Sequence, residues 1–181
     1  MIVGLNDIDA QVRQEEEYNR RLELAQTQAH MDALTGVGNK HAFLETEVRM
    51  DRLIEEQRQP PFSVVVFDVN DLKKINDSEG HQAGDQYLRD ASQIICGIFK
   101  NSSVFRVGGD EFAVISQGSE YDRVEELMEA MDRHNLEAIG SGGIVIACGM
   151  SRFDHDSCVA TVFERADHKM YDNKNWLKSR K

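Results

Sequence analysis

A β-branched run without alternation, Phe62-Ser-Val-Val-Val-Phe67, is the longest strongly apolar stretch of this 181-residue chain. A run of this kind suits a central strand that is covered on both faces. It follows Pro60-Pro61, which ends a helix predicted over 40–57, and it leads into the carboxylate Asp68. We therefore predict a sheet centred on residues 62–67, with Asp68 at one end.

The segments after residue 60 alternate between the sequence periods of strands and helices. Apolar side chains recur at three- and four-residue spacing in the helical segments, and two short strands flank a Gly-rich turn, which is typical of a hairpin. The predicted elements are a helix over 84–99, strands over 104–107 and 112–116, a helix around 124–131, a strand over 144–148 and a helix over 159–170. This β-α-β-β-α-β order is the ferredoxin-like arrangement, an α+β fold in which we expect helices against one face of the sheet.

The amino-terminal residues differ in composition and apolar spacing from the rest of the chain. Residues 7–30 are polar and helix-favouring, with a thin apolar stripe at approximate heptad spacing. They indicate a linker helix, and both a solvated helix and a short parallel coiled coil fit the pattern. We expect residues 1–30 to form the end of an upstream segment with its linker helix, and residues 31–181 to form the globular domain.

Composition and charge narrow the classes of function. Apolar residues make up 40% and charged residues 29%, as in ordinary globular proteins. With 21 Lys and Arg against 32 Asp and Glu, the net charge of −11 opposes non-specific nucleic-acid binding. No apolar run approaches the roughly 20 residues of a membrane span, and the start lacks a signal-peptide pattern, so we expect a cytoplasmic protein. The three cysteines include no C-x-x-C pair and predict neither a disulfide frame nor a zinc site.

The residues suited to chemistry gather at one end of the predicted sheet. In the ferredoxin-like order, the end of the first strand lies beside the hairpin tip, so Asp68 would meet Asp110 and Glu111. Three converging carboxylates repel one another unless a divalent cation lies between them, and oxygen ligands suit Mg²⁺ or Mn²⁺. Gly108 and Gly109 leave the backbone of the turn free to approach phosphate oxygens. Together these features predict a site for a metal-bound nucleotide.

The stretch Arg106-Val-Gly-Gly-Asp-Glu-Phe112 resembles the signature of the GGDEF family, the diguanylate cyclases, whose fold is similar to nucleotidyl cyclases and polymerase palms. Four further stretches resemble family motifs in the same order. They are Asp32-Ala-Leu-Thr-Gly36 with Asn39-Lys40, Phe67 to Asp77, Gly80 to Asp85, and Ala166 to Lys174. The resemblance covers about residues 32 to 178.

The resemblance implies a role for each matching residue. Asp68, the backbone carbonyl of Val69, and Asp110 would bind two magnesium ions, or manganese, per site, and Glu111 would act beside them in catalysis. The substrate-binding residues implied are Asn76 and Asp85 for guanine, Gly108 and Gly109 in the turn, and Lys174 and Lys178 for the triphosphate. A carboxylate accepts hydrogen bonds from guanine N1 and N2, which adenine cannot match, so GTP is favoured.

The implied reaction condenses two GTP into cyclic di-GMP and releases two pyrophosphates by two-metal phosphoryl transfer. Each domain would hold one GTP, so a homodimer is required. Residues 1–10, with Gly4-Leu-Asn-Asp-Ile8, resemble the last strand of a PAS-type sensor. The resemblance therefore implies a longer protein whose upstream sensory domain regulates the cyclase.

Two departures from the family pattern have consequences. Phe99-Lys-Asn-Ser102 stands where many members carry an R-x-x-D product-binding motif, which predicts that product inhibition through that site is lost. Asn70 replaces a frequent Asp and removes a charge near the metals. A non-catalytic GTP-binding or interaction module of the same fold is the main alternative, and a synthase of adenine-containing cyclic dinucleotides is another. Asp85 argues against the second.

Overall fold

The computed structural model describes residues 12–15, 17–18, 20 and 28–180. The chain divides into two units, Met1–Met31 and Asp32–Lys181. In the first unit, residues 12–15, 17–18, 20 and 28–30 are helical, as the sequence predicts. The sensor-like strand predicted within residues 1–10 lies outside the described residues.

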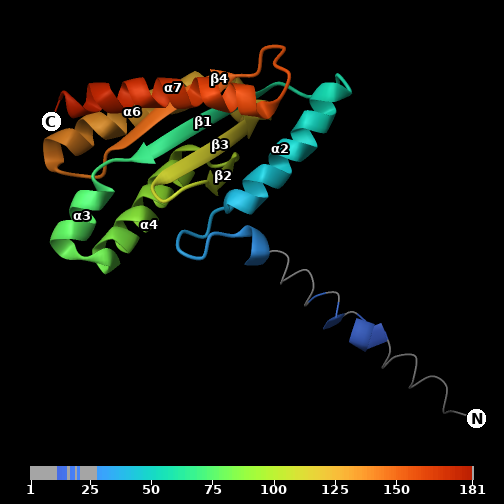
Figure 1. The fold of residues 1–181 in the computed structure, drawn as a ribbon, viewed down its shortest axis with the longest axis horizontal. Coiled ribbons are helices and arrows are strands. Elements are labelled where there is room, and N and C mark those ends of the chain that lie inside the picture. Colours follow the sequence, from blue (N-terminus) through green and yellow to red (C-terminus); the bar gives the residue numbers. More distant parts are fainter. Residues whose placement is uncertain (1–11, 16, 19, 21–27, 181) are drawn as a thin grey trace, which may run out of the picture. The chain divides into compact units, whose positions relative to one another are not determined.

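The second unit is built on a four-stranded sheet (Figure 1). Its strands are β1 (Phe62–Val69), β2 (Ser103–Arg106), β3 (Glu111–Gln117) and β4 (Ile146–Arg152). They lie in the order β2-β3-β1-β4, and every neighbouring pair is antiparallel. This is the ferredoxin-like order, so the predicted α+β fold class is confirmed.

Helices precede, connect and follow these strands. In the second unit they are α2 (Lys40–Glu55), α3 (Leu72–Glu79), α4 (His81–Ile98), α5 (Gly118–Asp122), α6 (Val124–Ser141) and α7 (Val159–Lys178). The bounds of α2 and α4 match the predicted segments within a few residues. Helices α6 and α7 begin where they are predicted but run further, to Ser141 and Lys178, and α3 and α5 are not among the predicted elements.

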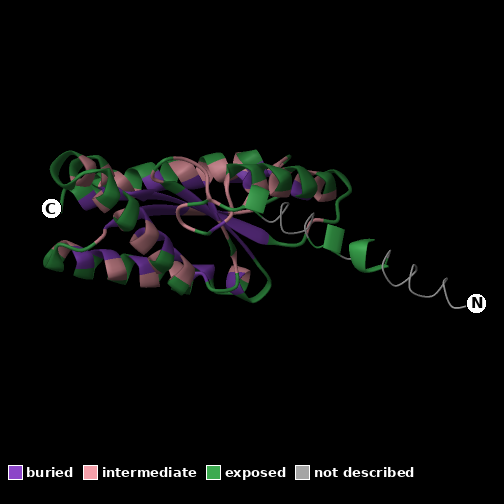
Figure 2. Cartoon of the chain, turned by 90° about the horizontal axis from the view of Figure 1, so that it is seen from below, coloured by how far each residue is buried: buried purple, intermediate pink, exposed green. Residues whose placement is uncertain are grey.

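Helices cover both faces of the sheet, and the expectation of a single covered face is wrong. Figure 2 shows the buried strands between two helical layers. Val64 and Val66 pack in one core with Met170 of α7, and Val65 and Phe67 pack in the other with Ile95 of α4. The reason lies in β1, which is buried along its whole length and therefore needs apolar cover on each side.

The ends of α2 and α7 are fixed by side chains. Asn39 caps α2 by accepting a hydrogen bond from the backbone N–H of Ala42 at 3.0 Å. The carboxylate of Asp51, on α2, accepts from the N–H of Val159 at 2.7 Å and so satisfies the first turn of α7. This contact ties the start of α7 to α2.

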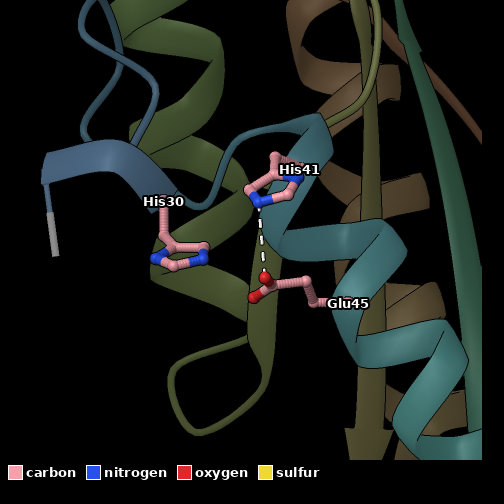
Figure 3. Close-up of side chains that lie close together, drawn as sticks. All are labelled: His30, His41 and Glu45. Carbon is pink, nitrogen blue, oxygen red and sulfur yellow. Dashed lines mark ion pairs between the residues drawn. The ribbon is translucent and has the colours of Figure 1, made fainter. Parts of the chain in front are cut away.

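The solvent side of α2 carries an ion pair at i,i+4 spacing. His41 Nε2 lies 3.3 Å from Glu45 Oε1, and both side chains are more than half exposed (Figure 3). An exposed pair of this kind contributes little to stability. Among the described residues, no helix is both long and apolar enough to cross a bilayer.

Candidate functional site

Three carboxylates meet where β1 ends and β3 begins. The antiparallel register places Asp68 opposite Glu111, and the N–H of Val69 donates to the carbonyl of Asp110 at 2.9 Å. Asp68 is only 6% exposed. The strand pairing thus brings together the acidic residues that the sequence analysis assigned to the metal site.

The electrostatics of the cluster are those of crowded anions. Burial raises the pKa of Glu111, and the carboxylates of Asp110, Asp68 and Asp167 raise it further, against the opposing effect of Lys174. Asp167 is on α7 and was not among the predicted site residues. No sequence pattern pairs Asp167 with the acidic cluster, because this residue reaches the cluster through the packing of α7 on the sheet.

Lys174 is the cation that the fold brings to this cluster. Lys174 is on α7, and its Nζ donates a hydrogen bond to Asp68 Oδ2 over 2.6 Å. Asp68 Oδ1, in contrast, is buried and has no hydrogen-bond partner among the described residues. Lys178, one turn further along α7, is exposed and forms no ion pair or hydrogen bond with the described residues.

These residues fit a divalent cation. An orphaned buried carboxylate oxygen on Asp68, with Asp110 and Glu111 adjacent, offers hard oxygen ligands whose mutual repulsion a cation would relieve. Magnesium and manganese both prefer such ligands. The carbonyl of Val69 lies in the same strand end and could complete the set.

The two glycines of the turn serve different purposes. A Cβ on Gly108 would lie 2.6 Å from Glu111 Oε2, so any side chain there would displace that carboxylate. A Cβ on Gly109 would meet nothing within 4 Å, and its backbone carbonyl accepts from Arg106 Nε at 3.1 Å and Nη2 at 2.7 Å. Gly108 protects the acidic cluster, whereas Gly109 leaves space for a ligand.

Asn76 and Asp85, the predicted guanine readers, lie on neighbouring helices. Asn76 is on α3 and half-buried, and Asp85 is exposed in the first turns of α4. Gly84 allows the two helices to touch, because a Cβ there would lie 1.9 Å from Asn76 Oδ1. The structure therefore brings the two residues to the same junction, and Gly84 is a requirement that sequence reasoning missed.

A half-buried clamp of Arg106 and Asp32 links the turn to the start of the domain. Arg106 donates to Gly109 O and, through Nη1, to both carboxylate oxygens of Asp32 at 3.2 and 3.3 Å. Thr35 donates to Asp32 from its backbone and its hydroxyl. Burial raises the pKa of Asp32, but these hydrogen bonds and the Arg106 charge outweigh it and lower the pKa. Asp32 is thus held as a carboxylate.

The turn before β2 is packed into the domain. Phe99 is 1% exposed and its ring meets Phe67 edge-on, with centroids 5.6 Å apart. The hydroxyl of Ser102 donates to Glu120, whose carboxylate also accepts from the N–H of Asn101 at 2.9 Å. Phe99 and Ser102 therefore face their own protein instead of a ligand.

The chain is similar to known proteins over most of its length. The model of a family described as "Diguanylate cyclase, GGDEF domain" matches residues 29–180. Diguanylate cyclase DgcS of Shewanella oneidensis is 31% identical over 151 residues, which cover 81% of this chain and 50% of that protein. Diguanylate cyclase DosC of Escherichia coli is 30% identical over 156 residues, covering 82% of this chain and 34% of the relative. The chain spans half or less of the length of these relatives.

A solved structure extends the likeness to the fold. The coiled coil and GGDEF domain of DgcB from Caulobacter crescentus, crystallised in complex with c-di-GMP, superposes with a TM-score of 0.79. The two chains are 25% identical, and the match covers 94% of this chain and 93% of that one.

Proposed function

Because this chain belongs to the GGDEF family of diguanylate cyclase domains, we propose that it condenses two GTP molecules into cyclic di-GMP. The observation that carries the proposal is the intact acidic cluster of Asp68, Asp110 and Glu111 beside Lys174. A non-catalytic module of this fold would have no need to keep three repelling carboxylates together.

The chemistry proceeds by the same displacement twice. The ribose 3′-oxygen of one GTP attacks the α-phosphorus of the other, a new P–O bond forms, and the bond to the β-phosphate oxygen breaks. Pyrophosphate leaves, and the hydroxyl proton is released to solvent. Divalent cations held by Asp68, the Val69 carbonyl and Asp110 would supply Lewis-acid activation of the hydroxyl and charge neutralisation.

The protein's own groups bind and orient the substrate. Asp85 accepts from guanine N1 and N2, and Asn76 serves the other edge of the base, which favours GTP over ATP. Lys174 and Lys178 contact the triphosphate. Gly109 allows the phosphates to approach the backbone of the turn, because nothing occupies the position of its Cβ.

Two copies must act together because each domain holds one nucleotide. A two-fold arrangement places each 3′-hydroxyl against the partner's α-phosphate, so activity depends on dimerisation. The helical first unit is the proposed dimerising and signal-transmitting element, and an upstream sensory domain is its proposed input.

We assign no product inhibition to the turn before β2. Phe99 is buried against Phe67, and Ser102 is bonded to Glu120, so neither side chain is available to a guanine base. This packing supports the absence of the R-x-x-D type of feedback.

The direct test is product analysis. Concentrated protein is incubated with Mg²⁺ and GTP, ATP or both, and products are identified by chromatography and mass spectrometry. Cyclic di-GMP from GTP alone is expected, with loss in Asp110→Asn. Asp122→Asn, an exposed acid on α5, serves as the matched control and should retain activity. GTP binding without any product at high protein concentration would instead favour the non-catalytic module.

A further inference from the structure

Within the described residues, Asn70 is hydrogen-bonded through its backbone but not through its side chain. The residue is 4% exposed. Its N–H donates to Val145 O at 3.0 Å, and its carbonyl accepts from the hydroxyl of Tyr87 at 3.1 Å. Neither the Oδ1 nor the Nδ2 atom of its side chain has a hydrogen-bond partner in the described part of the chain. A buried amide left unpaired destabilises the protein, so it needs an explanation.

The strand geometry indicates where this side chain lies. Asn70 continues the pairing of β1 with β4, because Val69 pairs with Ile146 and the N–H of Asn70 bonds to Val145. Side chains alternate along a strand, so Asn70 lies on the same face as Asp68. That is the α7 face, from which Lys174 reaches Asp68.

Three of the buried unpaired atoms therefore lie together in the proposed active site. Asp68 Oδ1 and both amide atoms of Asn70 are orphaned on one face of one strand end. Ser63, at the opposite end of β1, is also buried and has an unpaired hydroxyl. It lies about 23 Å from Asn70 along the strand, at roughly 3.3 Å per residue. A ligand bound at the acidic cluster would supply hydrogen-bond partners for the unpaired atoms of Asp68 and Asn70. Such a ligand would not reach Ser63.

We propose that Asn70 is a substrate-contacting residue of the cyclase site, an inference that rests on the proposed function. Its Nδ2 donates a hydrogen bond to a phosphate oxygen of the bound GTP, and its Oδ1 accepts from the ammonium of Lys174 or from water. A carboxylate at this position could not donate and would repel the phosphates. The amide thus adds a neutral donor where the substrate is most negative.

The test uses binding and stability instead of turnover. Asn70→Leu keeps the branch at Cγ and removes the polar atoms. The nucleotide-free variant is expected to melt roughly 2–4 °C higher, because a buried unpaired amide is gone. Its affinity for a GTP analogue with a methylene between the α- and β-phosphorus, measured by calorimetry with Mg²⁺, is expected to fall about tenfold. Asn70→Asp should also bind the analogue more weakly and supplies a second variant if Asn70→Leu folds poorly.

Ser63→Ala is the matched control. It removes another buried unpaired group from β1 and should leave analogue affinity unchanged. If both Asn70 variants bind the analogue as the unmodified protein does, the role of Asn70 is refuted while the proposed function stands. If the unmodified protein itself fails to bind the analogue, the proposed function falls and this inference falls with it.

Discussion

Lys174 Nζ lies 2.6 Å from Asp68 Oδ2 and joins α7 to the end of β1 across 106 positions of the sequence. Asp68 is largely buried and faces other carboxylates, so Lys174→Met leaves it without a counter-charge. We expect the free energy of unfolding to fall by about 2 kcal/mol in urea titrations, less than for a fully buried pair because Lys174 is partly exposed.

Magnesium should restore more stability to Lys174→Met than to the unmodified protein, since a cation can replace the ammonium beside Asp68. Lys169→Met is the control, because within the described part of the chain Lys169, on the same helix, bonds only to the carbonyl of Met150. Equal losses in the two variants would contradict a special role for the Lys174 pair.

Glu111→Gln should stabilise the protein at neutral pH. The folded-state pKa of Glu111 is raised by burial and by neighbouring carboxylates. Its contribution to stability is therefore full below the unfolded pKa of 4.5 and is lost as the pH rises through the higher folded pKa. The gain from Glu111→Gln, measured by thermal denaturation, should shrink as the pH falls toward 4.5.

Glu125→Gln provides a control of opposite sign. The hydrogen bond from Arg152 lowers the pKa of Glu125, so its ionised form stabilises the folded state above the unfolded pKa. This variant should lose stability at neutral pH, and the loss should vanish on acidification. The same sign for both variants would refute the electrostatic explanation.

Gly84→Ala and Gly97→Ala separate helix contact from helix propensity, because both glycines lie in α4. A Cβ at Gly84 would overlap Asn76, whereas one at Gly97 would meet nothing within 4 Å. Gly84→Ala is expected to cost about 2 kcal/mol and to weaken GTP binding. Gly97→Ala should stabilise by about 0.5–1 kcal/mol with binding unchanged. Urea titration and calorimetry measure both, and an unperturbed Gly84→Ala would show that α3 does not need this close contact.

The Arg106–Asp32 clamp should show strong energetic coupling. Arg106→Lys cannot reach the Asp32 carboxylate and the Gly109 carbonyl with one planar group, so we expect a loss of about 1–2 kcal/mol. A double-mutant cycle with Asp32→Asn should give a coupling of about 1 kcal/mol or more. The exposed Arg152–Glu125 pair offers a reference cycle, in which the coupling should be smaller.

Cyclic di-GMP should not inhibit through the turn before β2. Adding the product at increasing concentration is expected to leave the rate unchanged except where it competes with GTP. Phe99→Arg with Ser102→Asp would rebuild the family motif, yet it should destabilise the fold by about 3 kcal/mol or more because Phe99 is a core residue. Non-competitive inhibition of the unmodified protein would contradict this prediction.

The sequence was most informative where local pattern and burial agree. Residues 62–67 read as a doubly covered strand, and β1 is buried from Phe62 to Val69. It was least informative for α3, because Asn76, Asp77 and Ser78 are common turn formers and the helix lacks a side-chain N-cap bond. The contact between Asn76 and Gly84 on α4 stabilises α3, for which the local sequence has little helix preference.

Long-range contacts explain the other differences. The strand predicted over 144–148 is observed as Ile146–Arg152, because pairing with β1 extends to Ser63 opposite Arg152. The polar residues of that segment gave no local sign of a strand. Likewise, the approach of Lys174 to Asp68 and of Arg106 to Asp32 depends on packing between distant segments, which spacing alone does not reveal.

The burial of Phe99 also bears on how this protein could evolve. In the proposed cyclase, the first position of the product-binding motif is occupied by Phe99, a residue of the hydrophobic core. Mutations that restore the motif would therefore first destabilise the fold. The synthesis of cyclic di-GMP would then depend on the supply of GTP, on competition between GTP and the product, and on the number of paired domains. Any further control would have to come from outside the catalytic domain. The activity of such a protein would be set by its input signal and not by feedback from its product through that motif.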